Sequence, residues 1–72
     1  MIEFSERLKT IRKSKKLTQK QVANDTKIAE RAYQSYEINE QKPLFENLIA
    51  LADYFDVSLD YLVGRSDCPE RR

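Results

Sequence analysis

The sequence predicts an all-α fold of five short helices, and three observations lead to that prediction. Its 72 residues make one domain and leave no room for a second. Apolar side chains recur at the spacing of amphipathic helices, and no stretch alternates as a strand would. One glycine and two prolines leave little punctuation, which favours tight turns between helices. We expect residues 1–65 to form the domain and residues 66–72 a polar C-terminal tail.

The clearest helical stripes lie in the first and fourth segments. Apolar residues four and three apart predict a first helix over residues 4–15, whose last turn gathers lysines that suit the helix dipole. The stripe from Leu48 to Phe55 is the strongest in the chain and predicts a fourth helix over residues 45–55.

Two shorter helices are expected between these segments. Thr18 and Gln21 have the spacing of a capping box, which predicts a second helix that begins there and ends near Asp25. The polar stretch 24–27 is turn-prone, and a third helix should follow from Ala29 to Glu37.

A fifth helix is expected near the C-terminal end. Ser58 is suited to be its N-cap, and Gly64 should stop it. In the loop after the third helix, Asn39 is the residue best able to adopt a left-handed turn conformation. From Arg65 onward the chain is polar and contains Pro69, so we expect it to be frayed.

The composition argues against an enzyme. The chain has no histidine and one cysteine, Cys68, so it cannot assemble a nucleophile–base pair or an intramolecular disulfide. One glycine cannot build a phosphate-cradling loop. We predict a non-enzyme with no metal and no cofactor. The single thiol and the lack of a long apolar segment indicate a cytoplasmic protein that does not associate with membranes.

Charge is unevenly distributed, although the net charge is only +1. Residues 1–20 carry seven lysines and arginines against two glutamates, a balance of +5, whereas residues 43–72 balance at −3. Such polarity gives one end an anion-attracting field. Taken alone, it equally describes two ordinary solvated faces.

The pair of helices around Lys27 carries the functional information. Two helices joined by a short turn can place the second one in the major groove of DNA. The outward face of that second helix is polar, and its side chains can bond base edges: arginine to guanine, glutamine to adenine and glutamate to cytosine. This face consists of Glu30, Arg31, Gln34 and Ser35.

Four strings in the right order and spacing resemble the Cro/phage-repressor type of helix-turn-helix regulator, often called the Xre-like family. They are FSERLKTIR at 4–12, LTQKQVA at 17–23, ERAYQSYE at 30–37 and KPLFENLIALADYFDVSLDYLVGR at 42–65. The resemblance implies a compact, repressor-like DNA-binding domain. It also implies a sequence-specific transcriptional regulator, a repressor that occupies double-stranded operator DNA as a homodimer.

The resemblance implies roles for particular residues. Gln19 matches the glutamine that bonds a DNA phosphate and steadies a side chain of the reading helix. Lys42, just before Pro43, matches a position that contacts the DNA backbone. Arg12 and Glu37 match an internal ion pair. The expected DNA-binding residues are Gln19, Glu30, Arg31, Gln34, Ser35 and Lys42.

The chain departs from the family pattern in the turn region. Lys27 replaces the usual turn glycine, which costs roughly 1 kcal/mol if the position is left-handed. Ala29 stands where a serine or threonine cap is common, and Glu30 brings negative charge to the reading face. Tyr33 and Tyr36 occupy positions where the family has packing residues.

Two questions about partners stay open at this stage. The C-terminal segment has more apolar side chains than one short helix can bury, so we take it as a candidate dimer surface. Its residues are Tyr54, Val57, Leu59, Tyr61 and Val63. The alternative to an operator-binding repressor is a helix-turn-helix protein-interaction module, such as an antitoxin or a partner of another regulator. A general nucleic-acid binder is a further alternative.

Overall fold

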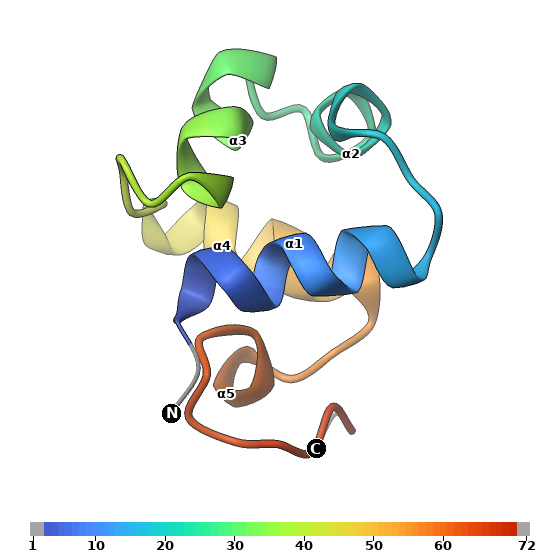
Figure 1. Ribbon diagram of the computed structural model, residues 1–72, viewed down its shortest axis with the longest axis vertical. Coiled ribbons are helices and arrows are strands. Elements are labelled where there is room, and N and C mark those ends of the chain that lie inside the picture. Colours follow the sequence, from blue (N-terminus) through green and yellow to red (C-terminus); the bar gives the residue numbers. More distant parts are fainter. Residues whose placement is uncertain (1–2, 71–72) are drawn as a thin grey trace.

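Five helices and no strand make up residues 3–70, the part of the chain that the computed structural model describes (Figure 1). The predicted all-α fold is confirmed: α4 has the predicted bounds, and the ends of the other helices lie within about one residue of those predicted. The helices are α1 (Phe4–Ser14), α2 (Gln19–Thr26), α3 (Glu30–Glu37), α4 (Phe45–Phe55) and α5 (Leu59–Leu62).

The helix α1 crosses the middle of the molecule and separates two groups of elements (Figure 1). Helices α2 and α3 lie on one side of α1, and α5 and the C-terminal segment lie on the other. Helix α4 contacts both α2 and α5 and so connects the two sides. As a result, α3 projects from the end of the molecule that is farthest from both termini.

Local sequence explains where the second helix begins. The hydroxyl of Thr18 accepts a hydrogen bond from the N–H of Gln21 at 3.0 Å, and the Gln21 side chain accepts one from the N–H of Thr18 at 2.8 Å. The predicted capping box is therefore confirmed. The helix runs one residue past Asp25, because the hydroxyl of Thr26 bonds back to the carbonyl of Val22 at 2.7 Å.

A left-handed residue follows the last turn of each of the five helices, and in four of them it is not glycine. Asn39 has a φ angle of 61°, as the sequence predicts, and Lys27 also has one of 61°, so the conditional cost of replacing the turn glycine applies. Lys16, after α1, and Asp56, after α4, are also left-handed, each with a φ angle of 57°. A residue with a β-carbon pays a steric cost in this conformation, so these turns are held by the packing of the helices that they join.

The core draws on all five helices. The side chains that are buried most completely belong to Leu8, Val22, Tyr33, Leu51, Phe55 and Leu62. Tyr33 and Tyr36 are 0% and 5% exposed, so the prediction that they pack in the core is confirmed. Burial of large apolar side chains contributes about 1.5–3 kcal/mol each, so this core is the main source of the domain's stability.

The C-terminal segment differs from the frayed tail that the sequence predicts. The N–H of Arg65 donates to the carbonyl of Asp60 at 2.8 Å, and the carbonyl of Pro69 accepts from the N–H of Ser58 at 3.0 Å. Helix α5 has only four residues, so its backbone groups need partners outside the helix, and the segment that follows supplies them. The last two residues of the tail lie outside the described part of the chain.

Among the described residues, no helix is both long and apolar enough to cross a lipid bilayer.

Candidate nucleic-acid interface

The turn between α2 and α3 fixes the angle between these helices. The left-handed Lys27 lets the chain reverse, and the N–H of Ile28 then bonds to the carbonyl of Ala23 at 3.0 Å. The Ile28 side chain is 6% exposed and joins the core between the two helices. Ala29 caps α3 without a side-chain hydrogen bond, as its methyl group requires.

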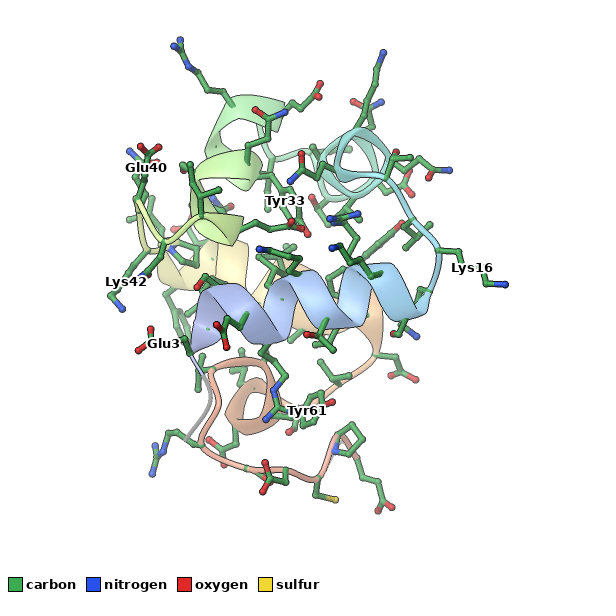
Figure 2. All side chains as sticks on the ribbon, viewed as in Figure 1. Glu3, Lys16, Tyr33, Glu40, Lys42 and Tyr61 are labelled. Atoms are coloured by element: carbon green, nitrogen blue, oxygen red, sulfur yellow. The ribbon has the colours of Figure 1, made fainter. Side chains whose placement is uncertain are left out.

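Glu37 ties the C-terminal end of α3 to α1 and α2. Its carboxylate accepts hydrogen bonds from the Arg12 guanidinium at 2.6 and 3.1 Å, from the Tyr33 hydroxyl at 2.6 Å and from the Gln19 amide at 3.0 Å. Figure 2 shows Tyr33 pointing from α3 into the space between α3 and α1. The ion pair of Arg12 and Glu37 that the family resemblance implies is therefore present.

The electrostatics of this cluster favour its charged state. Burial acts to raise the pKa of Glu37, but the hydrogen bonds from Arg12, Tyr33 and Gln19 outweigh it and hold that pKa below its ordinary value. The hydrogen bond to Glu37 raises the pKa of the Arg12 guanidinium. Burial, together with the bond to Glu37, raises the pKa of the Tyr33 hydroxyl. The cluster is thus an ionised, fully hydrogen-bonded anchor for α3.

The exposed face of α3 presents the side chains that the sequence singles out. Glu30, Arg31 and Gln34 are exposed, and Ser35 is half-buried. The Gln34 amide donates to the Glu30 carboxylate at 3.3 Å, one helical turn away. The Arg31 side chain has no hydrogen bond or ion pair with any residue in the range 3–70. Its five donors are therefore available to an external acceptor.

The two predicted DNA-contacting residues outside α3, Gln19 and Lys42, differ in their exposure. Gln19 is half-buried, and its amide is engaged with Glu37, so it steadies a side chain of α3 as the resemblance implies. Its backbone N–H belongs to the first turn of α2, where the helix dipole favours anions. Lys42 is exposed, and its side chain extends away from the helices (Figure 2).

The structure adds three residues that the sequence analysis does not include. A hollow beside α3 is lined on one side by Arg31, Gln34 and Ser35, and on the other by residues of the loop after α3. That loop contributes Ile38 and Gln41, together with Glu40. No spacing rule brings Gln41 next to the third helix, because the path of the loop decides it.

The exposed apolar residues do not lie where the sequence predicts a dimer surface. Val57 is buried, and the Arg7 guanidinium covers the Tyr61 ring at 3.9 Å from its centroid. Of the five predicted surface residues, only Leu59 is exposed; Val57 is in the core, Tyr54 and Tyr61 pack against it, and Val63 is half-buried. The exposed apolar side chains are instead mostly those of Ile38, Leu44, Phe45, Ile49 and Leu59.

Two helices held at a fixed angle across a short turn, with the polar side of the second one exposed, define a helix-turn-helix domain. The chain belongs to the helix-turn-helix family, whose model matches residues 8–62. The resemblance to Xre-like regulators is therefore confirmed, and this membership also agrees with the prediction that the chain is not an enzyme.

Individual relatives are transcriptional regulators by name. The chain is 40% identical to the uncharacterized HTH-type transcriptional regulator YobD of Bacillus subtilis, over 93% of this chain and 60% of that protein. It is 39% identical to the cryptic phage CTXphi transcriptional repressor RstR of Vibrio cholerae, over 89% of this chain and 57% of that protein.

A solved structure shares the fold. The crystal structure of a transcriptional regulator from Listeria innocua superposes with a TM-score of 0.79 at 38% identity, and the match covers 88% of this chain and 61% of that one. The chain thus spans about three-fifths of the length of the relatives named here.

Proposed function

We propose that this chain is a sequence-specific DNA-binding transcriptional regulator that inserts α3 into the major groove. The observation that carries the proposal is the contrast between the two ends of α3. Glu37 anchors the C-terminal end through four hydrogen bonds, whereas the side chain of Arg31, near the N-terminal end, has no partner among residues 3–70. A rigid helix with a free arginine suits bidentate bonding to guanine.

The remaining contacts follow from where the side chains lie. The Glu30–Gln34 pair is exposed beside Arg31 and is suited to read a neighbouring base pair, with glutamate accepting from cytosine and glutamine bonding adenine. The N–H of Gln19 is suited to hold one phosphate and the ammonium of Lys42 another. The proposed DNA-binding residues are Gln19, Glu30, Arg31, Gln34, Ser35 and Lys42.

We further propose that two copies bind a palindromic site and repress transcription by occupying promoter DNA. A single domain of 28 × 23 × 21 Å offers few cations to DNA, and two copies double its contacts. Two domains of this size, side by side, suit half-sites about 34 Å apart. One relative is named a repressor and another, BcrR of Enterococcus faecalis, an activator, so promoter occupancy is the step common to both.

The apolar stripe of α4 is the surface that we propose for the pairing. Phe45 and Ile49 lie one helical turn apart and are 67% and 37% exposed, and Leu59 of α5 is 36% exposed. Burying such side chains against their copies is favourable by about 25 cal/mol per Å². A Phe45→Glu variant should then be monomeric at concentrations where the unaltered chain is dimeric, as measured by analytical ultracentrifugation; a monomeric unaltered chain at high concentration would refute the pairing.

A fluorescence titration against promoter DNA upstream of its own gene tests the main proposal. Such a regulator acts where the DNA is, in the cytoplasm. We expect binding at least about a thousandfold tighter to promoter DNA than to a scrambled duplex, with a steep loss of affinity as salt rises. Equal affinity for both duplexes would indicate a general nucleic-acid binder instead.

The alternative function, a protein-interaction module, is favoured by a specific observation. Leu44 and Phe45 are 72% and 67% exposed, and Glu30 and Glu40 bring negative charge near the reading face. If the titration detects no affinity for either duplex at low salt, a pull-down from cell extract with the unaltered chain and with Phe45→Glu discriminates. A protein retained by the former and lost by the latter would support an antitoxin-like or regulator-binding role.

A further inference from the structure

The hydroxyl group of Ser35 donates its hydrogen bond within the protein. Its oxygen lies 2.6 Å from the carbonyl oxygen of Ala32 and 2.9 Å from the side-chain oxygen of Gln41, in the loop after α3. A serine hydroxyl carries one proton, and both neighbours are carbonyl oxygens that accept it. In this arrangement Ser35 has no proton left to donate to DNA, although it belongs to the reading face.

Backbone hydrogen bonds to Ser35 also hold the loop that carries Gln41 in place. The N–H groups of Glu40 and Gln41 both donate to the backbone carbonyl of Ser35, at 2.9 and 3.4 Å. The loop is therefore fixed against the end of α3 through its backbone and through one side chain. Holding the Gln41 side chain before any partner arrives removes part of the entropy cost of ordering it on binding.

The amide NH2 of Gln41 remains available as a hydrogen-bond donor. Its oxygen faces Ser35, and its nitrogen has no hydrogen-bond partner within residues 3–70. Gln41 is exposed and lines the same hollow as Arg31 and Gln34. Two donors therefore stand beside the reading face, outside the reading helix itself.

The groups around the hollow suit a base edge as the acceptor for these donors. Glu40 precedes Gln41 and offsets the charge of Arg31 in the same lining, so the hollow has no net attraction for a phosphate. The edges of guanine and thymine, by contrast, are neutral and present the acceptors O6, N7 and O4 in the major groove. Exposed Ile38, at 60%, adds an apolar neighbour that tolerates a thymine methyl group.

We propose that Gln41 is a specificity-determining residue, which donates from its amide NH2 to a base acceptor in the major groove, and that Ser35 is the positioning residue that aims this amide. The proposal rests on the proposed function and adds a base contact from the loop to those of α3. It also changes the role of Ser35 among the proposed DNA-binding residues, because Ser35 then acts through Gln41 and makes no base contact of its own.

Selection from a random duplex library tests this, using the unaltered chain, Gln41→Ala, Ser35→Ala and the double variant. Gln41→Ala should lose its preference at one base pair of each half-site and bind the preferred duplex about five- to tenfold more weakly, the effect of one hydrogen bond. Ser35→Ala should lose preference at the same base pair, and the double variant should be no worse than Gln41→Ala alone. Lys42→Ala serves as the control for a phosphate contact.

Three results would overturn the inference. They are an unchanged selected sequence for Gln41→Ala, a uniform loss on all duplexes like that of Lys42→Ala, and additive effects of Ser35→Ala and Gln41→Ala at different base pairs. A change in the thermal unfolding midpoint that accounts for the lost preference would also count against it. An unaltered chain that selects no sequence would refute the proposed function itself, which is a separate outcome.

Discussion

The carboxylate of Glu37 accepts two hydrogen bonds from the guanidinium of Arg12, at 2.6 and 3.1 Å, and so joins the end of α3 to α1. The Glu37 side chain is 1% exposed and the Arg12 side chain 12%. A buried ion pair of this kind adds little to the free energy of unfolding compared with an apolar pair of the same size. Removing one partner is nevertheless strongly destabilising, because it leaves a buried charge without its counter-ion. The orientation of the reading helix therefore depends on this contact.

Glu37→Gln should lower the free energy of unfolding by about 3 kcal/mol, because it leaves the Arg12 charge buried without its counter-ion. Urea denaturation measures this change. Glu40→Gln, at an exposed position three residues later, is the matched control and should change stability by less than about 0.5 kcal/mol.

If Glu37→Gln proves too unstable to fold, Tyr33→Phe provides a milder form of the same test. It removes only the hydroxyl that donates to Glu37 at 2.6 Å and should cost about 1 kcal/mol. A Glu37→Gln protein as stable as the unaltered chain would show that the anchor does not hold α3.

Stability should fall in acid because of Glu37. Its pKa is held below the ordinary value in the folded chain, so the unfolded chain binds a proton first as the pH falls. The stabilisation from this group is fully present above the unfolded value of about 4.3 and is lost as the pH drops through the folded pKa. The difference in unfolding free energy between the unaltered chain and Glu37→Gln should therefore shrink from about pH 6 to about pH 3; a constant difference would contradict the ionised anchor.

Lys27→Gly should stabilise the domain by about 1 kcal/mol. Lys27 has a φ angle of 61°, where a β-carbon is strained and glycine is not. The gain appears as a higher midpoint of thermal unfolding. Lys27→Ala is the control, since it keeps the β-carbon and should show no such gain; equal stabilisation by both variants would point to the lysine charge instead of the backbone.

Ala29→Ser should also stabilise, by about 1 kcal/mol, because it provides an acceptor for a free N–H at the start of α3. The backbone at Ala29 has φ and ψ angles of −57° and 135°, which a capping serine can adopt. Ala29→Val, which lacks the oxygen, should bring no gain in the same denaturation experiment. If serine and valine behave alike, the start of α3 is not limited by its missing cap.

Arg31→Ala and Lys42→Ala should affect DNA binding in different ways. Arg31→Ala removes the proposed base contact, so it should relax the preference for promoter DNA by about 1–3 kcal/mol. Lys42→Ala removes a proposed phosphate contact, so both duplexes should be bound more weakly by similar factors, with a shallower salt dependence. Fluorescence titrations at two salt concentrations separate the two effects, and identical profiles for the two variants would contradict the proposed division of roles.

Local sequence patterns were enough to predict most of the fold. The stripe from Leu48 to Phe55 and the capping box at Thr18 depend on residues three or four apart, so they are readable without knowledge of the rest of the chain. The same holds for the left-handed turn at Asn39, because asparagine is suited to that conformation where glycine is absent.

The tertiary structure alone decided which side chains are occupied and which are free. Ser35 and Gln41 are six residues apart, and they bond because the loop after α3 folds back over the end of the helix. Tyr61 is covered by Arg7, which lies 54 positions earlier in the chain. Such contacts depend on how distant segments pack, and no periodicity within either segment records them. The sequence by itself determined the helices and the reading face; packing determined which groups on that face remain available.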